Sequence, residues 1–199
     1  MDWTIFHGLN SSLAHRESAQ DAAQLYNAWA IFVLVAVGGA IWFLARPGGS
    51  DRSKLAALSA GFAGALALLA NVILGQLWFH DRPFVDHPGK TLLLVRHGSD
   101  NSFPSDHASL AFAIAFAVLV FHRRLGALLV LVAAGIAIDR IFVGVHYPID
   151  VLASVFVGLG SALLVTTLGR QSVASVARQL SRLSDPVVAA VSGRSPHRR

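Results

Sequence analysis

Long apolar stretches constrain the fold of this chain more than any other feature of its sequence. Five of them lie at residues 27–45, 55–79, 108–121, 125–145 and 149–168. About 20 apolar residues in a helix cross the hydrocarbon core of a bilayer. The third stretch approaches this length only when Ser105 and His107 are added at its start. We therefore predict an all-α, polytopic transmembrane bundle of about five helices.

The composition agrees with a protein whose solvent is a membrane. Only 14% of the 199 residues are charged and 54% are hydrophobic, whereas about a quarter of the residues of a soluble domain are charged. The chain has no cysteine, which excludes a disulfide framework, a zinc–thiolate site and a cysteine nucleophile. The net charge of +5 is spread between the apolar stretches and the tail. Because the basic residues form no single stripe, the sequence predicts no nucleic-acid partner.

The basic residues indicate how the bundle is oriented. With five spans, the connections 46–54 and 122–124 and the tail after Gly169 share one side of the membrane, and they hold most of the lysine and arginine. Cytoplasmic loops carry an excess of these residues. We therefore place this side in the cytoplasm. The segment 80–106, the turn 145–148 and the N-terminus are then expected to face outward.

Both ends of the chain have the pattern of amphipathic helices that lie on a membrane surface. Apolar residues recur three to four positions apart at Trp3, Phe6, Leu9 and Leu13, and again at Val173, Val176, Leu180 and Leu183. We divide the chain into an N-terminal interfacial segment (1–26), a membrane domain (27–168) and a basic cytoplasmic tail (169–199). The residues after Pro186 are expected to be disordered.

Polar residues at the ends of the predicted spans converge on the outer face. Such residues are costly beside a membrane and are therefore candidates for function. They fall in three groups: Arg82 and Pro83 after the second span; Pro104, Ser105, Asp106 and His107 at the start of the third; Arg140, His146 and Asp150 around the last turn. Since the alternating topology brings all three groups to one face, the sequence predicts a single pocket.

This set of residues matches the needs of phosphoryl transfer, which requires cations and donors around the phosphate, a nucleophile and an acid for the leaving oxygen. Arg82 and Arg140 can make bidentate contacts to phosphate. Ser105 adds a hydroxyl, and the N–H groups at the start of the third helix add an anion site. Asp150 can accept from one nitrogen of His146 and leave the other free as a nucleophile.

Other interpretations of the same residues stay open at this point. Arg82 can be an anchor at the membrane boundary, and Arg140 can pair internally with Asp139. The histidines and aspartates of the outer face can also suggest a metal centre, but their loop spacing fixes no ligand geometry. The prediction is therefore no metal and no other cofactor. Three more histidines share the outer segment without an assigned role: His80, His87 and His97.

Taken together, these motifs resemble the type 2 phosphatidic acid phosphatase family of membrane phosphatases. Its pattern is a lysine separated by six residues from Arg-Pro, then Pro-Ser-Gly-His, then Ser-Arg, five residues, His, three residues and Asp. The three groups above match these spacings, and the resemblance covers residues 55–168. The chain departs from the pattern at Gly75, Asp106 and Asp139, where the family has lysine, glycine and serine. Whether Lys90, Arg96 or nothing replaces the missing charge stays open.

Within that family, the segments 79–87, 102–107 and 144–150 are similar to the bacitracin-resistance branch. Its members are undecaprenyl-diphosphate phosphatases, which recycle the carrier lipid of peptidoglycan synthesis on the outer leaflet of the bacterial plasma membrane. The resemblance implies a metal-independent hydrolase in which His146 forms a phosphohistidine, Asp150 orients it and His107 protonates the leaving oxygen. It further implies that the phosphoryl group is bound by Arg82, Ser105, Asp106 and Arg140.

Two other functions stay open from the sequence. The first is the same fold acting on phosphatidate, phosphatidylglycerophosphate or another lipid phosphate, because apolar helices accept a polyprenyl chain and acyl chains alike. The second is a non-enzymatic transporter or lipid-binding protein whose buried arginine and histidines form a transport path. For undecaprenyl-diphosphate phosphatase and for a phosphatase of another lipid, the expected partner is a lipid phosphate substrate within the membrane.

Overall fold

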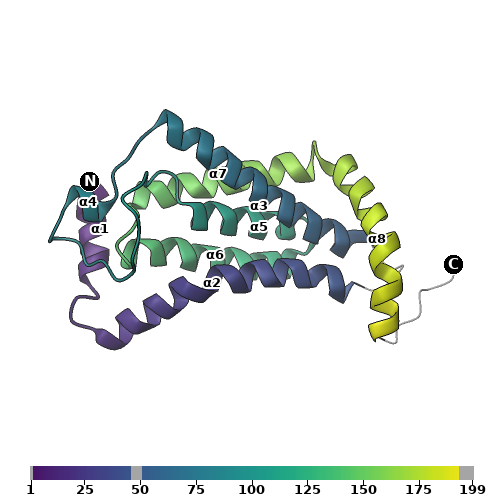
Figure 1. The fold of residues 1–199 in the computed structure, drawn as a ribbon, viewed down its shortest axis with the longest axis horizontal. Coiled ribbons are helices and arrows are strands. Elements are labelled where there is room, and N and C mark those ends of the chain that lie inside the picture. The colour runs from purple at the N-terminus through teal and green to yellow at the C-terminus, as the bar shows by residue number, and fades with distance from the viewer. Residues whose placement is uncertain (1, 46–50, 193–199) are drawn as a thin grey trace.

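The structure, a computed structural model, describes residues 2–45 and 51–192. The regular elements in these ranges are all helices: α1 (Asp2–Ser11), α2 (Glu17–Leu44), α3 (Asp51–Leu77), α4 (Pro83–Asp86), α5 (Asp106–Phe121), α6 (Arg123–Phe142), α7 (Pro148–Thr166) and α8 (Arg170–Ser192). Five of them form a bundle of roughly aligned helices: α2, α3, α5, α6 and α7 (Figure 1). The predicted all-α membrane bundle is confirmed.

Among the described residues, four helices are long and apolar enough to cross a membrane: α2, α3, α6 and α7. The fifth, α5, has 16 residues and is about 24 Å long at 1.5 Å per residue. It packs against α3, α6 and α7 in the middle of the bundle. Because these helices surround it, the length of α5 does not need to match the thickness of the hydrocarbon core. Small residues allow this close packing: a Cβ added at Gly158 of α7 would lie 2.6 Å from the Cβ of Phe112.

The α1–α2 connection, the α6–α7 connection and the loop between α3 and α5 lie at one end of the bundle, together with α1 and α4 (Figure 1). We call this end the α1 end. Helix α1 is anchored there by a buried side chain. The Asn10 amide donates to the carbonyls of Leu92 and Phe142, 2.8 and 2.9 Å away, and its oxygen accepts from the Leu92 N–H at 2.8 Å. Phe6 is fully buried beside it. The N-terminal helix thus packs against the long loop that carries Arg82.

The first membrane helix begins earlier than predicted. Helix α2 starts at Glu17, whereas the first apolar stretch starts at Asn27. The intervening residues are mainly alanine, glutamine and glutamate, which favour helix in water as well as in a membrane. Hydropathy detects only the part of a helix that lies in hydrocarbon. The boundary at residue 26 therefore falls within a helix, and the proposed division of the chain stays a prediction.

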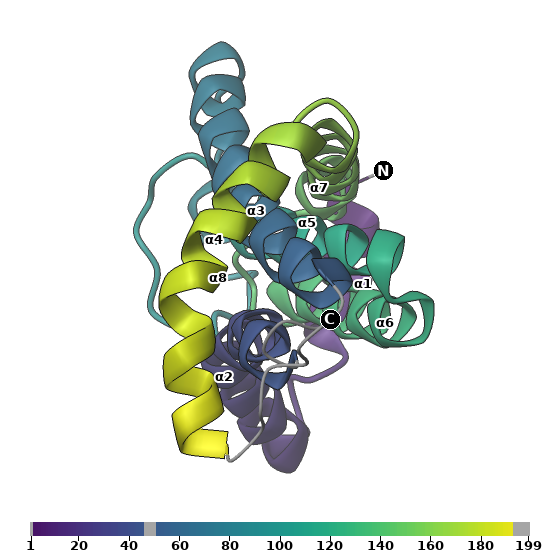
Figure 2. The ribbon, with the colours of Figure 1, turned by 90° about the vertical axis from the view of Figure 1, so that its right-hand side faces the viewer.

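Helix α8 crosses the opposite end of the bundle, the α8 end (Figures 1 and 2). Its helix continues through Pro186 to Ser192, so the expected disorder after Pro186 is wrong for residues 187–192. Buried Lys54 of α3 explains this, because its Nζ binds both carboxylate oxygens of Asp185 at 2.6 and 2.8 Å. Four of the arginines predicted to lie on the cytoplasmic side are outside the described residues: Arg46, Arg194, Arg198 and Arg199.

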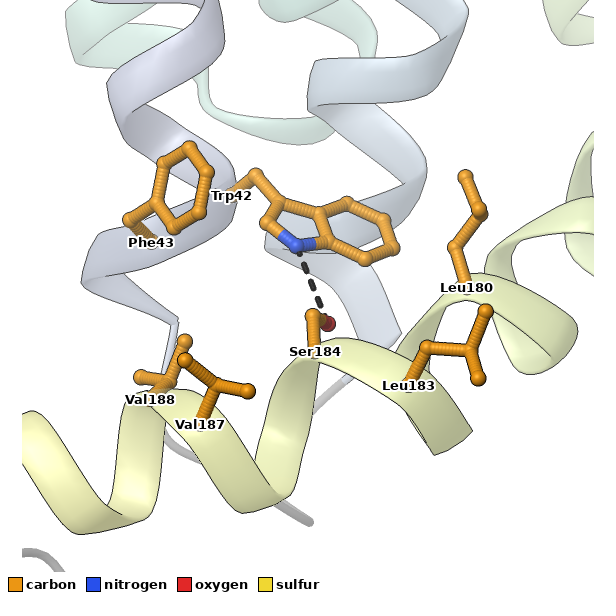
Figure 3. Close-up of a pocket in the computed structure, with 7 residues that line it drawn as sticks. All are labelled: Trp42, Phe43, Leu180, Leu183, Ser184, Val187 and Val188. Carbon is orange, nitrogen blue, oxygen red and sulfur yellow. Dashed lines mark hydrogen bonds between the residues drawn. The ribbon is translucent and has the colours of Figure 1, made fainter.

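An apolar groove of about 340 Å³ separates α8 from the end of α2 (Figure 3). Phe43, Leu183 and Val187 line it, and the Trp42 Nε1–H donates to Ser184 Oγ at 3.3 Å beside it. Leu183 and Val187 stay largely exposed, at 74% and 62%, and Arg178 and Arg182 are exposed as well. The placement of α8 along a membrane surface stays a prediction.

Candidate active site

All three groups of predicted site residues lie at the α1 end of the bundle. Arg82 follows α3 in the long loop, Ser105 is the N-cap of α5, and Arg140 lies in the last turn of α6. His146 stands in the turn between α6 and α7, and Asp150 lies in the first turn of α7. The side chains of these five residues are all buried.

The turn before α7 places His146. Gly144 has a φ of +89°, and a Cβ there would lie 2.4 Å from the Leu92 carbonyl oxygen, so the turn requires glycine. The N–H groups of Val145 and His146 both donate to the Arg140 carbonyl, at 3.2 and 3.3 Å. Pro148 then starts α7 at a position where its missing N–H is not needed. The imidazole is held between the ends of two helices and is 3% exposed.

The contacts of His146 determine which ring nitrogen carries the proton. Its Nε2 lies 3.2 Å from Nη1 of Arg82, a group that can only donate. Nε2 therefore carries the lone pair, and Nδ1 carries the hydrogen. Burial, together with the nearby arginines, lowers the pKa of His146 to about 3, so the ring is neutral at physiological pH. A neutral imidazole with its lone pair on Nε2 is a competent nucleophile once Arg82 gives up this contact.

Ser102 links His146 to Asp150, and sequence reasoning gave it no role. Nδ1 of His146 is 3.6 Å from the nearer carboxylate oxygen of Asp150 but 3.3 Å from Ser102 Oγ. The serine hydroxyl in turn donates to that same oxygen, Oδ2, at 2.5 Å. The predicted orientation of His146 by Asp150 is thus relayed through a hydroxyl. The only signal was the position of Ser102 two residues before the Pro104 motif.

Arg82 closes the site from the long loop. Its Nη1 donates to the Val145 carbonyl at 3.0 Å, its Nη2 to the Asn101 carbonyl at 3.1 Å, and its Nε to Asp100 Oδ1 at 3.2 Å. The side chain is 4% exposed. An arginine that anchors a protein at the membrane boundary keeps its head in water, so this interpretation does not fit Arg82.

Two polar atoms of the site have no partner. Within the parts of the chain that the structure describes, Ser105 Oγ and Arg140 Nε are the only buried side-chain nitrogen or oxygen atoms without a hydrogen bond. Leaving such a group unpaired costs about 1–3 kcal/mol. Arg140 donates from Nη1 to Asn27 of α2 and is not ion-paired with Asp139, the alternative left open above. Both free donors are suited to an anion.

His107 lies in the first turn of α5 and lines a small cavity with Arg140, Asn27 and Tyr26. It therefore shares a wall of the site with Arg140, whereas Ser102 and Asp150 hold the other side of His146. The Asp106 carboxylate contacts α3, where its Oδ1 accepts from the Asn71 amide at 2.8 Å. The contribution of Asp106 to phosphate binding stays a prediction.

The position of the missing lysine is packed against the long loop. The Asn101 amide donates to the carbonyls of Gly75 and Trp78 at 2.7 and 3.0 Å, and a Cβ at Gly75 would lie 3.1 Å from that amide nitrogen. Lys90 and Arg96 are both exposed. The residue that lies near the site is His97, whose ring centroid is 6.4 Å from that of His146. Burial and the neighbouring Arg82 lower the pKa of His97.

Within the described ranges, no group of three or more histidine, aspartate or glutamate side chains has the arrangement of a metal site. The metal-centre alternative thus finds no ligand set among them. Metal independence itself stays a prediction until a chelator is tested.

Comparison with known proteins assigns the family. The PAP2 superfamily matches residues 56–173, which include all the predicted site residues. This chain belongs to the PAP2 superfamily. The family resemblance inferred from the three motifs is therefore confirmed.

Relatives of this PAP2 protein include two bacterial proteins named BcrC. The undecaprenyl-diphosphatase BcrC of Bacillus subtilis is 36% identical over 80% of this chain and 79% of its own length. A Bacillus licheniformis protein named bacitracin transport permease protein BcrC is 37% identical over 66% of this chain and 63% of its own. The crystal structure of Aquifex aeolicus LpxE has the same fold, with a TM-score of 0.64, 22% identity, and coverage of 82% of this chain and 93% of that one.

Acid should destabilise this PAP2 protein through His146. Its folded-state pKa of about 3 lies below the ordinary value of 6.5, so the unfolded chain binds more protons between these values. The stabilisation is present above pH ~6.5 and is lost as the pH falls toward 3, by at most about 1.4 kcal/mol per pH unit. Thermal unfolding in detergent between pH 7 and pH 5 should be less pH-dependent in His146→Asn than in wild type. Equal slopes would contradict the lowered pKa.

Proposed function

We propose that this chain is a membrane undecaprenyl-diphosphatase, which hydrolyses undecaprenyl diphosphate to undecaprenyl phosphate and phosphate. The observation that carries the proposal is a buried, neutral His146 whose Nε2 lone pair faces Arg82, in a site where Ser105 Oγ and Arg140 Nε are unpaired. A phosphoryl group would supply acceptors for those two donors. The substrate follows from the similarity to BcrC of Bacillus subtilis.

In the proposed reaction, Nε2 of His146 attacks the terminal phosphorus and the bond to the bridging oxygen breaks. His107, in the protonated form that the bound anionic diphosphate favours, gives its proton to that oxygen, and undecaprenyl phosphate leaves. The positive charge that develops on the phosphoimidazole is stabilised through Nδ1–H by Ser102 and Asp150. Arg82 exchanges its contact with Nε2 for a contact with phosphate. Water then attacks phosphorus while His107 takes its proton, which releases phosphate and restores the free imidazole.

A transport function is the other candidate, because one relative is named a permease. A transport path needs polar groups along the whole length of a bundle. Here the buried charged groups other than Lys54 gather at the α1 end, and the central helix α5 presents Ala111, Ala113, Ala115 and Ala117 with no exposed surface. This distribution favours a site at one membrane face and supports hydrolysis over transport.

Phosphate release from purified protein in detergent tests the proposed function. Undecaprenyl diphosphate should be hydrolysed faster than phosphatidate or phosphatidylglycerophosphate in the same detergent. Because arginines and helix N–H groups supply the positive field, activity should persist in chelator, and vanadate should inhibit it by mimicking five-coordinate phosphorus. Preference for another lipid phosphate would replace the substrate, and loss of activity in chelator would revive the metal centre. No release from any lipid phosphate would refute the proposal.

Leaving groups separate the roles of the two histidines. His146→Ala should abolish turnover on every substrate, since it removes the atom that bonds to phosphorus. General acid catalysis contributes about 10²- to 10⁴-fold in rate, and this contribution shrinks when the departing oxygen needs no proton. An activated aryl phosphate should therefore restore much of the activity of His107→Ala and none of that of His146→Ala. A similar response of both variants, or a phosphohistidine trapped on His107, would reverse the assignment.

We also propose that the α1 end faces the outside of a bacterial plasma membrane, because the basic residues gather at the α8 end. The chain has no cysteine, so single cysteines report sidedness without background. Lys90 is a better place for the outer cysteine than the neighbouring Gly89, whose φ of +75° disfavours any side chain. Lys90→Cys should react with an impermeant thiol reagent in intact cells, and Arg124→Cys should not. The opposite pattern would invert the orientation.

A further inference from the structure

His80, which belongs to none of the three motifs, is hydrogen-bonded to the buried carboxylate behind His146. Its Nδ1 lies 2.8 Å from Asp150 Oδ1. Asp150 has no exposed surface, and an ionised carboxylate can only accept. The His80 ring therefore donates its Nδ1–H to Asp150. The imidazole is itself 28% exposed, so it reaches the carboxylate from the solvent side of the long loop.

The two oxygens of Asp150 have separate partners. Oδ2 accepts from Ser102 Oγ at 2.5 Å and from the Tyr147 N–H at 2.8 Å, while Oδ1 accepts from His80. Rotation of a carboxylate about χ2 is soft. Donors on both oxygens hold the group in the one orientation in which Oδ2 meets the serine that contacts His146.

His80 is held firmly enough to fix this orientation. Its backbone N–H donates to Asn101 Oδ1 at 3.0 Å, and its carbonyl accepts from the Ser102 N–H at 2.8 Å. Its ring is stacked on Tyr147, with centroids 5.0 Å apart. One residue thus joins the loop after α3, the loop before α5 and the start of α7.

We propose that His80 is a positioning residue for the phosphatase reaction: it holds Asp150 so that the Ser102 hydroxyl stays aligned with Nδ1 of His146. This inference rests on the proposed function of the site. Together with Nη1 of Arg82, which donates to Nε2, the contacts from His80 through Asp150 and Ser102 support the tautomer that leaves the lone pair on Nε2. They also stabilise the charge on the phosphoimidazole. His80 makes no contact with the reacting atoms, so its effect falls on turnover and not on substrate binding.

Two variants of His80 and one control test the proposal. His80→Ala removes the donor, whereas His80→Asn places an amide N–H close to the position of Nδ1 and keeps it. His87→Ala is the matched control: it lies in the same loop and is 3.1 Å from the Tyr147 hydroxyl, but it is not bonded to Asp150. Each purified variant is first compared with wild type by gel filtration and thermal unfolding.

With the lipid phosphate that wild type hydrolyses best, His80→Ala should lower kcat by roughly 10- to 100-fold, as loss of an outer partner does for a metal-bound histidine, with KM changed less than twofold. His80→Asn should recover most of the loss, and His87→Ala should stay within about threefold of wild type. Normal turnover in His80→Ala, or a folded His80→Asn as slow as His80→Ala, would overturn the proposal. A change confined to KM would make His80 a substrate contact and would overturn it as well.

A second measurement does not require turnover. ¹⁵N-NMR of histidine-labelled protein, with the His146 signals assigned from His146→Asn, reports which nitrogen carries the hydrogen. Wild type and His80→Asn should show hydrogen on Nδ1 with the same Nδ1 chemical shift. His80→Ala should shift the Nδ1 signal, because the Ser102 hydroxyl that contacts Nδ1 loses its alignment. An inactive wild type with this pattern would refute the phosphatase function but leave the alignment of His146 by His80 in place. An unchanged Nδ1 signal in His80→Ala would refute that alignment.

Discussion

A carboxylate without exposed surface, Asp150, organises the α1 end of the bundle. Burying a charge is very unfavourable unless donors surround it, and α7 itself supplies only the Tyr147 N–H. The other donors come from the long loop, through His80 and Ser102. The loop between α3 and α5 must therefore close over α7 before the carboxylate is satisfied. The same closure brings Arg82 against His146, so one electrostatic requirement assembles the proposed nucleophile and the proposed anion site together.

The remaining polar groups of the site show the opposite condition. Ser105 Oγ and Arg140 Nε are buried and unpaired, and the protein bears that cost in the absence of a ligand. Fixed donors that need not reorganise stabilise charge in a transition state better than donors recruited from solvent. Preorganised phosphoryl transfer requires both conditions: Asp150, on the Nδ1 side of His146, has donors on both oxygens, while Ser105 Oγ and Arg140 Nε remain unpaired for the phosphate. The rigid ends of α5 and α6 hold these donors without help from substrate.

The sequence predicted the parts of the molecule that depend on local pattern and failed where distant contacts decide. Apolar length located the five bundle helices, and motif spacing located His146, Asp150 and Arg82. Nothing local distinguishes Ser102 or His80 from other loop residues, because their roles arise only when the loop closes over α7. The residues after Pro186 were expected to be disordered, yet α8 continues to Ser192, and the Lys54–Asp185 pair, which joins residues 131 positions apart, holds the helix beside Pro186. The early start of α2 was missed because a polar helix leaves no hydropathy signal.

The departure from the family pattern at Gly75 belongs to the same closure of the long loop. The Asn101 amide sits where a side chain at Gly75 would begin, 3.1 Å from a Cβ at that position, and it binds the last carbonyls of α3. Its oxygen accepts from the N–H groups of His80 and Phe103, and its carbonyl accepts from Arg82. A Cβ at position 75 would require the Asn101 amide to shift by a few tenths of an ångström, although this amide is already bonded to the end of α3 and to the loop. Position 75 therefore lies, in place of a cation, against the asparagine that joins the end of α3 to the loop carrying Arg82 and His80.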